Sequence, residues 1–221
     1  MRRRMTFADR DEAGLLLAER LAGMDLAAPL VLALPRGGVP VGAQIARRLG
    51  APLDVVLVRK LGAPEEPELA IGAVADGDEP EIVLNARVVE DLGVIEEFIR
   101  SATARELAAI AQRRSDYAGV RPRVAPFGRT AIVVDDGVAT GMTMQAALRA
   151  IRRQKPARVI VAVPVASRDA VTLLQGEADE VVCLSAPRRF GSVGSFYRTF
   201  RQVSDADVAR LLVAVSARMS A

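Results

Sequence analysis

The sequence has no histidine and only one cysteine, Cys183, among its 221 residues. Because histidine is the commonest general base and a frequent ligand of transition metals, its absence removes both roles from the chain. A single cysteine excludes an intrachain disulfide and a thiolate metal cluster. Cys183 lies within the apolar run 181–184, which is typical of a buried strand residue.

Long hydrophobic runs are also missing. No apolar stretch reaches the roughly 18 residues that a membrane span requires. Three arginines follow Met1, as at the start of a signal peptide, but charged residues at 9–12 occupy the place of its apolar core. We therefore expect a cytoplasmic protein that does not enter a membrane.

Lysine is scarce as well. It occurs only at Lys60 and Lys155, so arginine supplies nearly all of the positive charge, and the net charge is +3. The arginines occur as scattered pairs rather than as one run, which is typical of solvated helix and loop faces. The charge pattern therefore does not indicate nucleic-acid binding.

Strand-like apolar runs alternate with helical apolar spacing along most of the chain. The expected strands are 30–34, 53–58, 131–134, 158–163 and 180–184, and the expected helices are 9–21, 39–49, 143–154, 167–174 and 206–215. This alternation predicts an α/β fold with a doubly wound, mostly parallel sheet flanked by helices. We expect one domain over residues 1–221. A strand pair at 69–75 and 81–84 and a helical insert at about 86–117, broken near Gly93, interrupt the alternation.

The most informative segment is 130–143, where a buried apolar run ends in Asp135 and Asp136 and a Gly/Thr turn then opens a helix. Open α/β sheets bind ligands at the carboxyl ends of their strands. The turn offers backbone N–H groups, hydroxyls and the positive end of a helix dipole, which suit a phosphate. Two acids beside a phosphate would repel it unless they faced sugar hydroxyls or a Mg²⁺ ion.

The segment Asp135-Asp136-Gly137-Val138-Ala139-Thr140-Gly141-Met142-Thr143 resembles the signature of the type I phosphoribosyltransferases. The resemblance implies that the acidic pair holds the ribose hydroxyls of phosphoribosyl pyrophosphate (PRPP) and a Mg²⁺ ion, the latter through water or through those hydroxyls. It assigns the 5′-phosphate to a loop made of Ala139, Thr140, Gly141, Met142 and Thr143. It also implies a small C-terminal hood at about 186–221.

Two further segments match the place of the family's pyrophosphate site. Arg36, Gly37 and Gly38 follow the first expected strand, where glycines let the backbone approach an anion closely. Arg59 and Lys60 close the next strand and are candidates for charge stabilisation during catalysis. The alternatives are an ordinary strand-helix turn and a surface cation pair. The Pro/Gly/Glu-rich stretch 62–68 corresponds to the family's flexible loop, which closes over the reacting centre.

The acceptor is the least determined part of the prediction. Four aromatic residues cluster within 190–200, and we predict that Phe196 and Tyr197 contact a base. The cluster suits a small satellite core equally well. Family members that use 6-oxopurines carry an acidic residue where this chain has Ala139, which argues against hypoxanthine or guanine as the acceptor.

Taken together, the resemblance implies a Mg²⁺-dependent enzyme that transfers the phosphoribosyl group of PRPP to a nitrogen heterocycle and releases pyrophosphate. By analogy with the family we also expect a homodimer. Two alternatives stay open: a PRPP-binding regulator with little or no catalysis that acts on nucleic acid, and a non-catalytic assembly domain.

Overall fold

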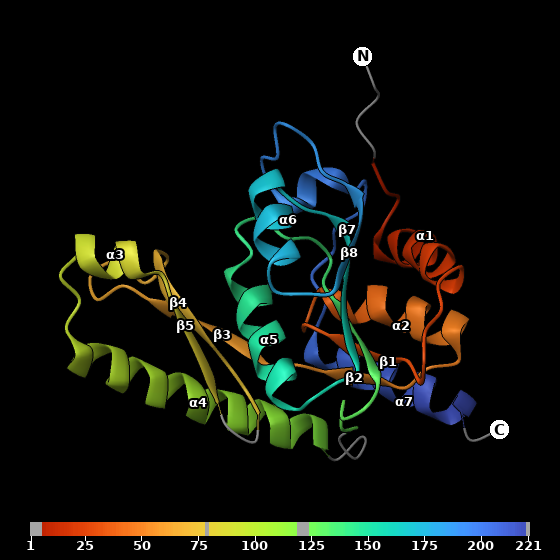
Figure 1. The fold of residues 1–221 in the computed structure, drawn as a ribbon, viewed down its shortest axis with the longest axis horizontal. Coiled ribbons are helices and arrows are strands. Elements are labelled where there is room, and N and C mark those ends of the chain that lie inside the picture. The colour runs from red at the N-terminus through yellow and green to blue at the C-terminus, as the bar shows by residue number, and fades with distance from the viewer. Residues whose placement is uncertain (1–5, 78–79, 119–123, 220–221) are drawn as a thin grey trace.

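Two sheets of different kinds organise the chain in the computed structural model, which describes residues 6–77, 80–118 and 124–219 (Figure 1). The larger sheet has five parallel strands in the order β2-β1-β6-β7-β8. These strands are β1 (Leu30–Ala33), β2 (Leu53–Val55), β6 (Thr130–Val134), β7 (Arg158–Val165) and β8 (Glu180–Ser185). Over the described ranges, no helix combines the length and apolar character that crossing a membrane requires.

Helices cover both faces of this parallel sheet. The helices α1 (Arg10–Ala22), α2 (Gly38–Leu49) and α7 (Asp205–Met219) share one core with Ile132 and Val134 of β6. On the other face, α5 (Met142–Arg153) and α6 (Arg168–Gln175) share a second core with Ala131 and Val133. Successive strand residues point to opposite faces, so one apolar strand supplies both cores. The predicted doubly wound α/β fold is confirmed.

A smaller antiparallel sheet contains β3 (Val58–Gly62), β4 (Ala70–Ala75) and β5 (Glu81–Leu84). It lies between α5 and the helical insert, which forms α3 (Ala86–Asp91) and α4 (Glu96–Ala118). In Figure 1 this sheet and α4 form an arm that extends away from α1 and α7. The predicted strand pair and the break near Gly93 are confirmed, since Gly93 has φ of +58° between the two helices.

The predicted strand 53–58 is wrong at its end, because the chain changes sheets there. β2 ends at Val55, and Val58 begins β3 in the small sheet. Leu57 already pairs with the small sheet, since its N–H donates to Asp76 Oδ1 at 3.0 Å and its carbonyl accepts from the Asp76 N–H at 2.9 Å. Arg59 and Lys60 therefore lie inside a strand of the small sheet, not at the end of a parallel strand.

The segment for which the sequence predicts a hood, 186–221, is described up to residue 219. It holds a short 3-10 helix, η1 (Val193–Phe196), followed by α7. Val208, Leu212 and Val215 of α7 are buried in the core that α1 and α2 share. α7 therefore belongs to the helical layer that packs on the sheet, whereas Phe196 and Tyr197 belong to a separate small core.

Close contact of α1 with α2 depends on Gly14, and we predict that Gly14→Ala destabilises the fold. Alanine normally stabilises a helix interior by about 1 kcal/mol relative to glycine. Here its Cβ would lie 2.8 Å from the Val41 carbonyl oxygen and 3.0 Å from Gln44 Cβ, so the helices must separate. We expect a net loss of about 1–2 kcal/mol in urea unfolding.

The matched control is Gly23→Ala at the end of the same helix. Gly23 has φ of −84°, and a Cβ added there would lie 3.8 Å from its nearest neighbour, the Arg20 carbonyl oxygen. We expect that variant to stay within about 0.5 kcal/mol of the wild type. A Gly14→Ala protein more stable than the wild type would contradict this account of the packing.

Candidate active site

The acidic pair lies where the fully buried strand β6 ends. The backbone N–H of Asp136 donates to Asp135 Oδ1 at 2.8 Å, which orients the Asp135 side chain. Burial, with repulsion from the adjacent Asp136 carboxylate, holds the pKa of Asp135 well above its usual range. Burial also raises the pKa of Asp136, although the guanidinium of Arg10 opposes that shift. The site thus contains two desolvated carboxyl groups with one cation beside them.

Arg10, from the first turn of α1, is the partner of Asp136. Its Nε and Nη2 each lie 2.7 Å from Asp136 Oδ2, and both side chains are nearly buried, at 12% and 13% exposure. Its Nη1 donates to the Arg201 carbonyl at 2.7 Å, and its guanidinium stacks 3.8 Å above the Phe200 ring. Because both contacts use Oδ2, Oδ1 remains for a ligand. Sequence reasoning missed Arg10, since no motif marks a residue so distant in the chain.

The predicted phosphate loop has the expected geometry. Gly141 has φ of +89°, and α5 begins at the next residue. The loop is held in place by Ser167, whose hydroxyl donates to the Ala139 carbonyl at 2.6 Å. Ala139 and Thr140 are exposed. The first amides of a helix have no intrahelical partner, so this exposed turn can bind an anion.

The loop at 36–38 lies directly against the acidic pair. A Cβ at Gly37 would lie 2.0 Å from Asp136 Oδ2, and one at Gly38 would lie 2.6 Å from the Val134 carbonyl oxygen. Only glycine permits this approach of the two loops. The side chain of Arg36 extends the other way and forms an ion pair at 3.4 Å with Asp205. The structure therefore brings together the predicted pyrophosphate loop and the predicted ribose site.

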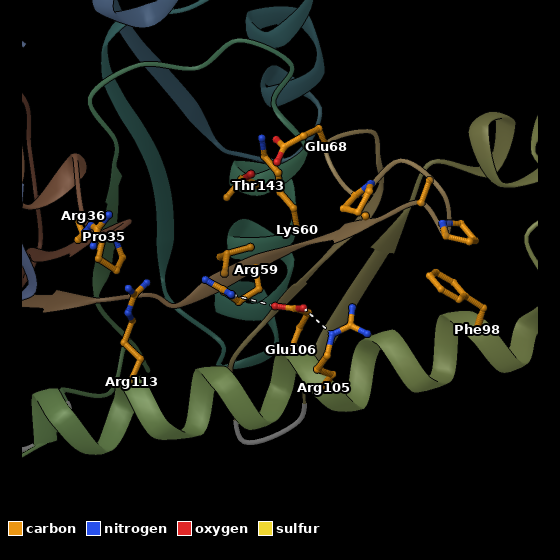
Figure 2. A pocket seen from close by; sticks show the side chains of 15 residues that line it. Pro35, Arg36, Arg59, Lys60, Glu68, Phe98, Arg105, Glu106, Arg113 and Thr143 are labelled. Carbon is orange, nitrogen blue, oxygen red and sulfur yellow. Dashed lines mark hydrogen bonds and ion pairs between the residues drawn. The ribbon is translucent and has the colours of Figure 1, made fainter. Parts of the chain in front are cut away.

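A cavity of about 770 Å³ opens beside these loops (Figure 2). Among the predicted residues, Arg36, Arg59, Lys60 and Thr143 line it. Adjacent strand residues point in opposite directions, and Figure 2 shows Arg59 directed at α4 and Lys60 directed toward Thr143. Arg59 Nε lies 3.0 Å from Glu106 Oε2. The pair that the sequence places together is thus divided between two sides of the cavity.

A second hollow, of about 470 Å³, lies next to the first, and Arg36 lines both. Its walls also include Arg10, Gly37, Asp136 and Phe200. Phe200 is 40% exposed. Three charged residues of the insert helix, Arg105, Glu106 and Arg113, line the larger cavity and were not predicted from the sequence.

The two aromatic residues predicted to contact a base, Phe196 and Tyr197, are buried in a small core. Phe196 is 0% exposed and Tyr197 is 6% exposed, and both pack with Phe7 and Val165 in a satellite core. The Tyr197 hydroxyl donates to the Asp136 carbonyl at 2.5 Å, so this ring supports the acidic pair from behind. The packing alternative therefore describes these two rings, and base contact by either ring is not supported, because neither has an open face.

No group of three or more carboxylate, thiol or imidazole side chains within the described ranges could by itself hold a metal ion. Asp136 Oδ1 is the acidic oxygen that Arg10 leaves available. A carboxylate oxygen of this kind can supply one ligand to a Mg²⁺ ion, which commonly takes its other ligands from substrate phosphates and water.

Comparison with known proteins identifies close relatives. The family model described as "Phosphoribosyl transferase domain" matches residues 11–196. Two Mycobacterium tuberculosis proteins, from strains CDC 1551 / Oshkosh and ATCC 25618 / H37Rv, are each named "Putative phosphoribosyl transferase". Both are 44% identical over 206 residues, which cover 93% of this chain and 46% of theirs, so the chain spans about half the length of these curated relatives.

A solved structure matches over nearly the whole chain. The crystal structure of TT1426 from Thermus thermophilus has 48% sequence identity and a TM-score of 0.82. The match covers 95% of this chain and 99% of that one.

We predict that the Arg10–Asp136 ion pair stabilises the folded protein. Replacing Arg10 with methionine leaves a nearly buried carboxylate without its partner, and we expect a loss of about 3 kcal/mol in urea unfolding. The matched control is Arg48→Met, which breaks an exposed pair with Glu19 (50% and 67% exposed) and is expected to leave the urea midpoint close to that of the wild type. Equal losses in the two variants would show that Arg10 does not stabilise the acidic pair.

Proposed function

This chain belongs to the phosphoribosyl transferase domain family, and from that premise we propose that it is a Mg²⁺-dependent enzyme that transfers the 5-phosphoribosyl group of PRPP to a nitrogen heterocycle. One observation carries the proposal. The acidic pair at the end of β6 lies against Gly37 on one side and is followed by the exposed turn at the start of α5. The segments to which we assign the sugar, the pyrophosphate and the 5′-phosphate thus adjoin one another.

Each part of PRPP has a matching group. The ribose hydroxyls donate to Asp135 and Asp136, and the 5′-phosphate accepts from the amides and hydroxyls of the 139–143 turn. The pyrophosphate lies against Gly37 and Gly38 and faces Arg36, Arg59 and Lys60. When bound, Mg²⁺ supplies positive charge to the pyrophosphate oxygens, and Asp135 and Asp136 help to hold it through water or the ribose hydroxyls.

The reaction needs positioning and charge stabilisation more than a protein nucleophile. As the C1–O bond breaks, pyrophosphate takes the electron pair, and the cations of the cavity stabilise its growing negative charge. The buried carboxylates ease the positive charge that develops on the ribose. A nitrogen of the acceptor then bonds to C1 and loses its proton to solvent or to the departing pyrophosphate.

Phe200 is 40% exposed and lines the same hollow as Asp136 and Gly37, so an acceptor beside the ribose site would meet this ring. The Arg10 guanidinium and the Tyr197 ring already stack on Phe200, so the contact we propose is with the exposed edge of the ring and not with a free face. Ala139 leaves no acidic group at the position that 6-oxopurine enzymes of the family use, which favours another heterocycle. Homodimer formation and a cytoplasmic location stay predictions.

The first test is pyrophosphate release from Mg²⁺·PRPP with a pooled panel of nucleobases and related heterocycles. We expect release that depends on the pool, and splitting the pool would identify the acceptor. No release, from protein shown in the same preparation to bind PRPP, would favour a PRPP-binding regulator over an enzyme.

Asp136→Asn tests the site itself. Removing the charge that accepts the ribose hydroxyls is expected to lower turnover by at least tenfold, which corresponds to about 1.4 kcal/mol of transition-state stabilisation. Asp91→Asn, at a residue that is 67% exposed in an ion pair with Arg87, is the control and should keep wild-type turnover. Unchanged turnover in Asp136→Asn would overturn the assignment.

A further inference from the structure

The large cavity carries more positive charge than the family resemblance assigns to it. Five cationic side chains line it: Arg36, Arg59, Lys60, Arg105 and Arg113. Two of them, Arg105 and Arg113, come from the insert helix α4, which lies outside the segments matched to the PRPP site. Two carboxylates, Glu68 and Glu106, share the lining.

Arg113 is placed to act with Arg36. In Figure 2 its side chain rises from α4 toward the loop that carries Arg36. Both guanidinium groups contact one carboxylate, since Asp205 lies 3.4 Å from Arg36 and 3.5 Å from Arg113. A hydrogen bond from Tyr117, with the charges of Arg113 and Arg36, holds the pKa of Asp205 below its usual range. Two arginines therefore share a single ionised carboxylate at this end of the cavity, and one positive charge remains unbalanced.

Glu106 has the same role at the other side. Its Oε2 lies 3.0 Å from Arg59 and its Oε1 lies 3.3 Å from Arg105, and the carboxylate is only 15% exposed. Arg105 and Arg113 are eight residues apart, which corresponds to about 12 Å along the helix. Arg105 and Arg113 thus lie spaced along α4, and each is joined to a predicted pyrophosphate-binding arginine through one carboxylate.

We propose that α4 is a second wall of the pyrophosphate site, in which Arg113 binds the anion directly and Glu106 and Asp205 are counter-ions that pyrophosphate displaces from Arg59 and Arg36. The inference rests on the proposed function for the identity of the anion. Pyrophosphate carries several charges and can accept from more than one guanidinium at once. A single carboxylate cannot match it. No bond is made or broken in the exchange, which replaces one set of ion pairs with another.

The test is calorimetric titration of the full chain with inorganic pyrophosphate at low ionic strength. Arg113→Gln removes a direct ligand and should weaken binding about tenfold. Glu106→Gln removes a competing anion and should tighten binding about three- to tenfold. Tighter binding is a sharp criterion because a damaged fold would weaken binding instead.

Two variants on α4 control for long-range charge. Arg100→Gln and Glu97→Gln change the net charge by the same amounts, but their side chains are 66% and 74% exposed and pair with each other at 3.4 Å. Both should bind pyrophosphate as the wild type does. If the control variants changed the affinity for pyrophosphate as much as Arg113→Gln and Glu106→Gln do, net charge, and not the wall formed by α4, would determine that affinity.

PRPP titrated in parallel separates this inference from the proposed function. Wild-type binding of PRPP, with pyrophosphate affinity unchanged in both Arg113→Gln and Glu106→Gln, would overturn the role of α4 and leave the proposed function standing. The expected pyrophosphate pattern without any PRPP binding would support the anion wall and contradict the proposed function.

Discussion

Two adjacent carboxyl groups buried at the end of β6 are the constraint on which the site depends. Desolvation disfavours the charged form of each, and their mutual repulsion adds to the cost. The fold compensates with one guanidinium, that of Arg10, which reaches Asp136 from a helix 126 residues away in the sequence. The same guanidinium binds the Arg201 carbonyl and stacks on Phe200, so the beginning and the end of the chain meet at the acidic pair. Stability and the proposed ligand binding therefore depend on the same residues at this point.

The buried acidic pair also requires the loop that carries Gly37 and Gly38 to lie very close to the end of β6. The carboxylate of Asp136 occupies the space that a side chain at residue 37 would need, and the strand end occupies the space beside Gly38. If PRPP binds as proposed, its ribose and its pyrophosphate must lie within one molecule's length of each other, which requires the two loops to touch. The glycines make that contact possible, and Tyr197 holds the acidic loop in place from the opposite side.

Much of the fold and the central segment of the candidate site could be predicted from the sequence, because both depend on residues that are close together in the chain. The apolar runs define the parallel strands, and the acidic pair with its Gly/Thr turn is continuous in the chain. What could not be predicted depends on tertiary contacts. Val56 and Leu57 are buried like the residues before them, so nothing local shows that the chain changes sheets there. Phe200 is exposed whereas Phe196 and Tyr197 are buried, and nothing local in the sequence distinguishes these three rings. The partners of Asp136 and Asp205 are likewise too distant in sequence to be marked by any motif.

The cations of the large cavity differ in how they are held, and that difference has a physical consequence. Each of its four arginines forms an ion pair with a carboxylate, whereas Lys60 forms none with the residues that the structure describes. Lysine has a compact, strongly hydrated charge on a flexible stem, and arginine has a planar fork that suits a fixed bidentate partner. If a polyanion enters as proposed, it meets no paired carboxylate among the described residues at Lys60, near Thr143, but it competes with a carboxylate at each arginine. A cavity of unpaired like charges would destabilise the arm through repulsion, so the counter-ions that compete with the ligand also allow the site to exist before the ligand arrives.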